Sequence, residues 1–199
     1  GYKWIYKERI VAKGYVQTHD IDYDKTFAPI AKMMTVCTLL AVAAAKGWNL
    51  HQFDVKNAFL QGDLEEEVYM VQPPGFQSKV HSTAVCALKK SLYGLKQAPR
   101  AWHYKSMQFL RKIGLEASQA DTSLYVHQGS EHALCVLVHV DDLVIAGVDL
   151  TDVNRVKAQL SSMFEMKDLG KLHYLLGIEV IHTPSGLLLT QRHYALNML

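Results

Sequence analysis

The chain has 199 residues, 49% apolar and 20% charged, which is enough to bury a globular core and excludes a disordered chain. Its 21 Lys and Arg against 19 Asp and Glu give a formal charge of +2, which permits an anionic partner without requiring one. The three cysteines, Cys37, Cys86 and Cys135, are too scattered for a disulfide framework or a zinc site and suit a reducing compartment. No apolar run reaches the roughly 18 residues of a membrane span, so no membrane partner is expected.

The apolar pattern predicts a mixture of strands and helices. In chain order these are a strand at 9–13, a helix at 34–47, strands at 50–55 and 84–89, a helix at 98–114, a hairpin at 133–147, a helix at 151–164 and a hairpin at 174–191. A loop-rich stretch at 71–83 contains Pro73, Pro74 and Gly75. Strand runs mixed with helices predict an α+β domain, in which helices pack on one face of an antiparallel sheet.

Local signals mark where several of these elements begin, end or turn. Gly47 and Gly114 are expected to end the first two helices, and Thr151 is expected to cap the third. The first hairpin is expected to turn at Val140-Asp141-Asp142 and the second at Pro184-Ser185-Gly186.

Two adjacent carboxylates, Asp141 and Asp142, interrupt the apolar run of the first hairpin. Burying a pair of like charges costs desolvation and repulsion, and a bound divalent cation offsets both costs. Asp54 also follows an apolar strand and could meet the pair on a neighbouring strand. Three carboxylates at one end of a sheet could hold two Mg²⁺ ions for a phosphoryl-type displacement. The alternative is a solvated hairpin turn, because Asp is common in turns.

Longer motifs give the sequence a specific resemblance. They are RIVAKGYVQTHDIDYDKTFAPIAKM, GWNLHQFDVKNAFLQGDLEEEVYMVQPPGF, LKKSLYGLKQAPRAW, HVDDLVIAG, FEMKDLGKLHYLLGIEV and LLLTQRHYALNML. In this order they resemble the reverse transcriptase domain of Ty1/copia-type LTR retrotransposons over nearly the whole chain. The resemblance implies a right-hand polymerase with palm and fingers, an RNA-directed DNA polymerase that transfers nucleotides from dNTPs to a primer 3′-hydroxyl.

The resemblance also implies roles for individual residues. Asp54, Asp141 and Asp142 match the catalytic, metal-binding aspartates, with Mg²⁺ as the cofactor and Mn²⁺ as its substitute. The residues that match substrate-contacting positions are Arg9, Lys13, Phe59, Tyr93, Gly94, Gln97 and His139. Phe59 would exclude a 2′-hydroxyl, although burial in a core is the commoner fate of a Phe. Lys167 is a candidate general acid, although an ordinary surface lysine would look the same.

Three features depart from the family pattern. His139 stands where the family usually has Tyr, and Cys37 stands where Arg is common. The sequence KWIYKERIVAKG joins two strands that the family separates with extra residues, which looks like a deletion in the fingers. We expect residues 1–199 to be one fingers-and-palm domain, a fragment that lacks a complete thumb and the RNase H domain.

Competing functions follow from these features. The first is an active polymerase that binds an RNA or DNA template with its primer, together with dNTPs and other segments of the polyprotein. The second is a truncated or decayed remnant that folds and binds nucleic acid without polymerising. A cyclase or nuclease would explain the carboxylates but not Phe59 or SLYGLKQAP. The family implies a cytoplasmic, virus-like particle whose DNA product is bound for the nucleus; oligomeric state does not follow from the sequence.

Overall fold

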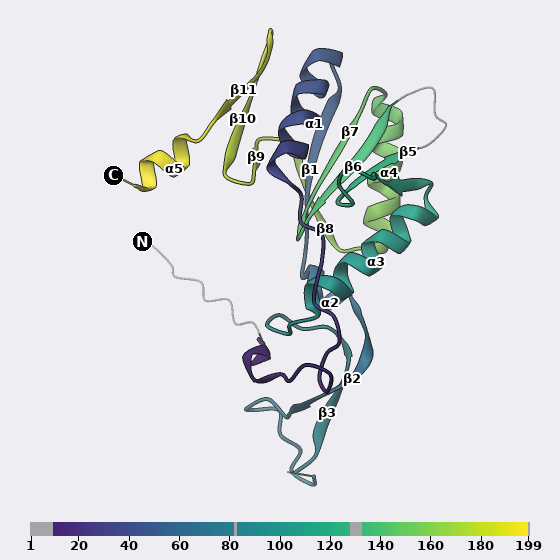
Figure 1. Ribbon diagram of the computed structural model, residues 1–199, viewed down its shortest axis with the longest axis vertical. Helices are drawn as coiled ribbons and strands as arrows, with labels where there is room; N and C mark the ends of the chain where they lie inside the picture. Colours follow the sequence, from purple (N-terminus) through teal and green to yellow (C-terminus); the bar gives the residue numbers. More distant parts are fainter. Residues whose placement is uncertain (1–9, 82, 128–132, 199) are drawn as a thin grey trace. The chain divides into compact units, whose positions relative to one another are not determined.

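The computed structural model describes residues 10–81, 83–127 and 133–198 (Figure 1). The chain divides into two compact units. The first comprises Gly1–Ala28 and Phe59–Lys105, and the second comprises Pro29–Ala58 and Ser106–Leu199. Each unit has strands and an apolar cluster of its own. Within the described ranges, no helix combines the length and the apolar character that crossing a membrane requires.

A six-stranded sheet with the order β4-β5-β6-β7-β1-β8 forms the centre of the second unit. Its strands are β1 (Asn49–Val55), β4 (Leu115–Ala117), β5 (Leu124–His127), β6 (Leu134–His139), β7 (Asp142–Gly147) and β8 (Met166–Lys171). Every neighbouring pair is antiparallel. A smaller sheet follows, with the strands β9 (Tyr174–Leu175), β10 (Ile178–Thr183) and β11 (Gly186–Thr190), and then helix α5 (Arg192–Asn197).

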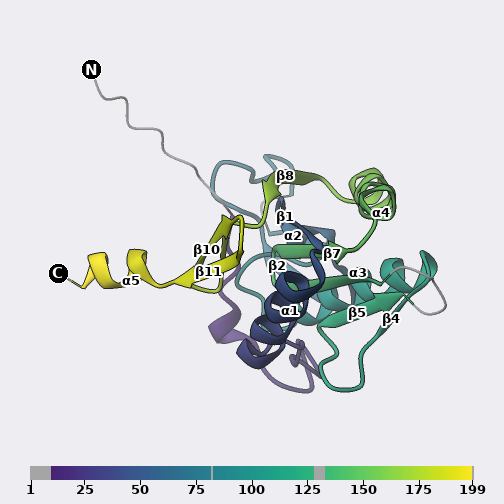
Figure 2. The same cartoon turned by 90° about the horizontal axis from the view of Figure 1, so that it is seen from above.

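Helices cover both faces of the six-stranded sheet (Figure 2). On one face lies α1 (Met33–Lys46), whose Val36, Leu40 and Ala43 share a cluster with Val144. On the other lies α4 (Leu150–Met163), where Lys157 stands over the ring of Phe53. The Ser106–Lys112 part of α3 (Ala98–Lys112) joins α4 there, since Phe109 meets Phe164 edge-on.

The expectation that helices pack on one face only is therefore wrong. The physical reason can be read in β6 and β7, where five consecutive residues in each strand are buried. A strand with one solvated face alternates apolar and polar residues, whereas a continuous apolar run indicates cover on both faces.

The two long helices of this unit are capped in different ways. No side chain of the N-cap residue Lys32 caps α1; instead Asp121 accepts hydrogen bonds from the Lys32 N–H (3.1 Å) and the Thr35 hydroxyl (2.6 Å). Helix α4 has a local cap, because Asp149 accepts from the Thr151 N–H at 2.7 Å. The cap of α4 is thus Asp149 and not Thr151, which lies inside the helix.

A two-stranded ribbon of β2 (Asp63–Val71) and β3 (Val85–Lys90) dominates the first unit. The short α2 (Ala58–Gln61) leads into β2, and a 3-10 turn, η1 (Gly14–Val16), lies nearer the N-terminus. Val68, Leu95 and Ala98 form the apolar cluster of this unit.

Most of the predicted elements are confirmed. The helices at 34–47, 98–114 and 151–164, the strands at 50–55 and 84–89 and the hairpin at 133–147 form within one or two residues of the expected bounds. The hairpin at 174–191 turns where expected, but its first strand is interrupted after Leu175 and resumes at Ile178 as β10. The strand at 9–13 is wrong over its described part, because Ile10–Lys13 is not a strand. Only Ala12 makes a strand-like bond there, to the carbonyl of Tyr93 at 2.7 Å. Strands β2, β4, β5 and β8 were not predicted from the sequence.

Candidate active site

The hairpin of β6 and β7 ends in a two-residue turn, Val140–Asp141. His139 and Asp142 close the turn as cross-strand partners. Val140 has φ 51° and is the only one of the two turn residues with a positive φ, which is the sign pattern of a type II′ turn. Glycine usually occupies that position because a β-branched residue is strained there. Since a Val is held in this conformation, the packed strands on either side must fix the turn.

The neighbouring strands bring four predicted residues into one row. Asp142 on β7 lies opposite Asp54 on β1, and Asp54 lies opposite Lys167 on β8. His139 on β6 lies opposite Asp142 from the other side. Residues opposite each other in a sheet point to the same face, so all four side chains project from the α1 face. We call His139, Asp142, Asp54 and Lys167 the polar row.

Backbone hydrogen bonds fasten this end of the sheet. The Val55 N–H donates to the carbonyl oxygen of Asp141 at 2.8 Å, which ties the turn to β1. The Lys56 N–H donates to the carbonyl of Glu165 at 2.9 Å, and the two side chains form an ion pair at 2.6 Å. The turn that carries Asp141 is therefore bonded to the last residue of β1, and the residue after β1 is bonded to the residue before β8.

The electrostatics of the row reflect partial burial of like charges. Burial raises the pKa of the Asp142 carboxyl, and the negative charge of Asp54 raises it further. A hydrogen bond from Gln52 and the proximity of His139 act in the opposite direction. Burial also lowers the pKa of His139, although Asp142 and Asp141 oppose the shift. Within the described ranges, His139 Nδ1 is buried and has no hydrogen-bond partner.

The donor set fits a hard divalent cation. Mg²⁺ and Mn²⁺ prefer carboxylate oxygens, and a positive ion would relieve the repulsion that raises the Asp142 pKa. Asp54, Asp141 and Asp142 could hold such an ion. Among the residues that the structure describes, however, three ligand atoms of His, Cys, Asp or Glu lie within 4.8 Å of one another only at the exposed His19, Asp20 and Asp24.

Gln52 is a residue at this site that the sequence analysis missed. It is only 4% exposed, and its Nε2 donates to Asp142 Oδ1 at 3.2 Å. The signal was present in the sequence, since Gln52 stands two residues before Asp54 in a strand and therefore shares its face. A polar residue at that buried position is a departure from the apolar pattern of β1.

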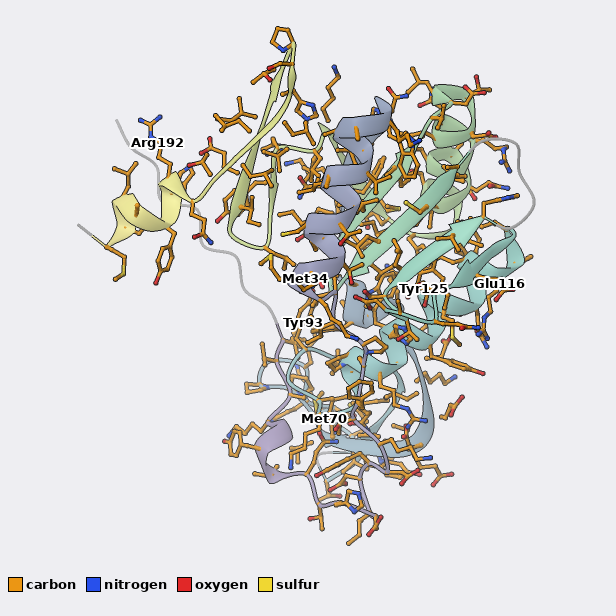
Figure 3. The ribbon with its side chains drawn as sticks, turned by 45° about the horizontal axis from the view of Figure 1, so that its top comes forward. Met34, Met70, Tyr93, Glu116, Tyr125 and Arg192 are labelled. Carbon is orange, nitrogen blue, oxygen red and sulfur yellow. The ribbon has the colours of Figure 1, made fainter. Side chains whose placement is uncertain are left out.

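The remaining predicted site residues that the structure describes belong to the first unit. Phe59 and Tyr93 pack together, with ring centroids 4.7 Å apart (Tyr93 is labelled in Figure 3). Gln97 is buried, and its amide donates to the Asp22 carbonyl at 2.9 Å and accepts from Gln17 at 3.0 Å. Lys13 is exposed.

Two predicted features need separate mention. Gly94 has φ 92°, and a Cβ there would lie 2.1 Å from the carbonyl oxygen of Ala12. The close approach that Gly94 permits is therefore to the chain's own backbone. Arg9 and the KWIYKER segment lie outside the described residues. Cys37 is exposed on α1.

Comparison with known proteins adds a family match to this geometry. The family model described as reverse transcriptase (RNA-dependent DNA polymerase) matches residues 3–199. The chain is 48% identical over 194 residues to the retrovirus-related Pol polyprotein from transposon RE1 of Arabidopsis thaliana, covering 98% of the chain and 13% of that polyprotein.

Relatives from other organisms match over a similar range. The retrovirus-related Pol polyprotein from transposon TNT 1-94 of Nicotiana tabacum is 42% identical over 95% of the chain and 14% of the polyprotein. The transposon Ty1-BR Gag-Pol polyprotein of Saccharomyces cerevisiae is 30% identical over 88% of the chain and 10% of the polyprotein. The chain thus spans between 10% and 14% of the length of these three relatives.

Proposed function

Because the chain belongs to the reverse transcriptase (RNA-dependent DNA polymerase) family, as the reverse transcriptase domain of a copia-type Pol polyprotein, we propose that it extends a primer on an RNA or DNA template with dNTPs. One observation supports this proposal above the others. Asp54 and Asp142, far apart in sequence, are direct cross-strand partners at one end of the sheet. The neighbouring Asp141 is fastened to the same end through Val55.

The three aspartates would hold the metal ions of the reaction. Reverse transcriptases use divalent metals, and we propose Mg²⁺ with Mn²⁺ as its substitute, bound by Asp54, Asp141 and Asp142. Two such ions would activate the primer 3′-hydroxyl and stabilise the leaving oxygen of the pyrophosphate. Lys167 stands opposite Asp54 and is the candidate general acid. His139 would contact the primer end, where its ring replaces the usual Tyr.

The two units would take different parts of this work. We propose that the second unit is the palm and that the first unit supplies the fingers, where Arg9 and Lys13 would meet the triphosphate. Phe59 would exclude a ribose 2′-hydroxyl, and its ring contact with Tyr93 supports a fixed orientation. Gly94 and Gln97 would shape the surface for the template mainly by holding the backbone, since the Gln97 amide already has two partners in the chain.

The family match also supports wider proposals about partners and place. The domain would act beside the other segments of a Pol polyprotein, in a cytoplasmic virus-like particle, on DNA bound for the nucleus. Binding to template–primer would weaken steeply with salt, because contacts to the phosphate backbone release counterions.

A second candidate function is a polymerase remnant that folds and binds nucleic acid without extending a primer. One observation favours it, namely that Asp54, Asp141 and Asp142, all described by the structure, do not bring three ligand atoms within 4.8 Å of one another. The departures at His139 and Cys37 are consistent with it.

Primer extension distinguishes the two candidates. The wild-type chain is assayed on poly(rA)–oligo(dT) with dTTP and Mg²⁺ or Mn²⁺, beside Asp141→Asn and His139→Tyr. We expect extension by the wild type and a loss of about 1000-fold in Asp141→Asn, since a bound metal supplies several kcal/mol of transition-state stabilisation. No extension by the wild type or by His139→Tyr, with salt-sensitive template binding retained, would establish the remnant instead.

A further inference from the structure

Gln52 occupies a position in β1 where an amide has no obvious structural purpose. It is 4% exposed, and its strand neighbours are Val144 on β7 and Gly170 on β8. Leu50, two residues earlier on the same face, belongs to the apolar cluster beneath α1. An apolar side chain of similar length would therefore suit the surroundings of Gln52.

The amide is also incompletely satisfied. Its Nε2 has a partner, Asp142 Oδ1, but its buried Oε1 receives no hydrogen bond from any described residue. A buried carbonyl without a donor lowers stability. The amide thus costs stability, and its one hydrogen bond goes to a residue of the polar row.

The direction of that hydrogen bond is fixed by charge. An ionised carboxylate has only acceptor oxygens, so Gln52 must present its NH₂ group to Asp142 and turn Oε1 away. The contact is diagonal across the sheet, since Gln52 lies opposite Val144 and Asp142 is two residues before Val144. Gln52 therefore reaches Asp142 along the sheet from the interior, while Asp54 faces it from directly opposite.

Neutrality is what makes an amide suitable for this position. A Lys or Arg donor would neutralise Asp142 and compete with a cation for it, whereas an amide supplies a hydrogen bond without a charge. Partners that orient a metal ligand in this way commonly change metal affinity or activity when they are removed.

We propose that Gln52 is a positioning residue of the metal site. Its amide holds the Asp142 carboxylate by Oδ1 and thereby leaves Oδ2 to the ion. This inference rests on the proposed function, because it assumes that Asp142 is a metal ligand. It assigns no chemical step to Gln52 itself, which acts only through Asp142.

The test measures Mn²⁺ binding to the 199-residue chain. Binding is monitored as the loss of the free Mn²⁺ signal in electron paramagnetic resonance. Gln52→Met keeps the length of the side chain and removes the donor. We expect its apparent Kd for Mn²⁺ to rise by about 10-fold to 100-fold. Its Tm should stay the same or rise, since the unsatisfied carbonyl is removed as well. A residue with a merely structural role would change Tm and leave the Kd unaltered.

Gln159→Met is the matched control. Gln159 lies in α4 on the other face of the sheet, and its Oε1 is likewise buried without a partner among the described residues. We expect this variant to bind Mn²⁺ as the wild type does. Gln52→Asn is a second variant in case Gln52→Met does not fold; it keeps the amide, but it is one methylene too short to reach Asp142, so its Kd should rise too.

Primer extension separates failure of this inference from failure of the proposed function. If the wild type binds Mn²⁺ and extends primers, and Gln52→Met does both with the same metal midpoint, only the positioning role is overturned. An equal loss in Gln159→Met would overturn it as well. If the wild type binds no Mn²⁺ at millimolar concentration and extends no primer, the proposed function fails and the inference fails with it.

Discussion

Two hairpins of the second unit share a topology and differ in almost everything else. Both are antiparallel pairs with a two-residue turn, Val140–Asp141 in one and Pro184–Ser185 in the other. In the β6–β7 hairpin five residues of each strand are buried, whereas Leu188 and Leu189 of β11 are 54% and 41% exposed. In the first hairpin Asp142 faces the carboxylate of Asp54 on β1, whereas Glu179 in the second faces Thr190 and Tyr174.

The difference shows what burial contributes to a site. In the β10–β11 hairpin the positive φ, 143°, falls on Gly186 directly after the turn, where a glycine adopts it without strain. In the β6–β7 hairpin Val140 has φ 51°, because packing against helices on both faces and hydrogen bonds to β1 fix the positions of the two strands. Covered strands can hold an unfavourable turn and a pair of like charges, and an exposed hairpin cannot.

The sharpest test of this comparison is to remove apolar side chains from each hairpin. Ile145→Ala in β7 should lower the free energy of unfolding by about 3 kcal/mol, since its side chain is fully buried and leaves a cavity. Leu189→Ala in β11 should cost less than about 1 kcal/mol, because that side chain is already partly in water. Urea unfolding followed by circular dichroism measures both. Equal losses would mean that the two hairpins are equally well supported.

A smaller effect on stability is expected from Asp121, which caps α1, the helix that covers one face of the buried β6–β7 hairpin. Asp121 is buried and holds the start of α1, 86 residues away along the chain from its partner Thr35. Burial alone would raise the pKa of Asp121, but hydrogen bonds from Ser123, Thr35 and Lys32 outweigh it and lower the pKa to about 2. Asp121→Asn should lower the free energy of unfolding at pH 7 by about 2 kcal/mol.

The same residue gives the comparison a pH dependence. Asp121 in the unfolded chain takes up a proton near its ordinary pKa of 3.8, whereas in the folded chain it stays ionised down to about 2. Its stabilisation is therefore complete above pH 4 and is lost as the pH falls from about 4 to about 2. The free energy of unfolding of Asp121→Asn, measured in urea, should therefore vary less between pH 4 and pH 2 than that of the wild type. Asp149→Asn is the control, because Asn caps a helix as well as Asp and should cost little.

The smallest predicted effect concerns the turn itself. Val140→Gly should raise the free energy of unfolding by roughly 0.5 to 1 kcal/mol, since glycine adopts a positive φ without strain. Val148 is also exposed but does not have a positive φ, so Val148→Gly should lower stability by a similar amount. Thermal unfolding of the two variants compares them directly. A loss in Val140→Gly would show that the turn is not strained.

Sequence reasoning succeeded where a single local pattern dominated. The apolar runs around Asp141 predicted the β6–β7 hairpin, and Gly47 marked the end of α1, where it has φ 65°. Strand β2 was missed because the acidic residues Asp63, Glu65, Glu66 and Glu67 interrupt any alternation of apolar and polar residues. Only one of its nine residues is buried. An exposed ribbon leaves little apolar signal to read.

The carboxylates of the site could be predicted from the sequence, whereas the residues that position them were harder to predict. Asp54, Asp141 and Asp142 stand out because carboxylates interrupt apolar strands. The cross-strand partners of a residue are not written in its neighbours, so neither the position of Lys167 opposite Asp54 nor the cap from Asp121 followed from local pattern. Gln52 could have been found, because it is a polar residue two positions before Asp54 in the same strand and therefore shares its face.

The bond from Val55 to the carbonyl of Asp141 has a consequence for how this chain can change its length. One residue added to the Val140–Asp141 turn or removed from it would shift β7 against β1 by one position. Such a slip turns every side chain of β7 to the opposite face, so Asp142 would point at α4 and Leu143 would enter the polar row. The loop between β2 and β3 is held by hydrogen bonds of the Gln72 side chain, but the β2 strand beside it has only one buried residue. We therefore expect insertions and deletions to be tolerated better in that loop than in the Val140–Asp141 turn.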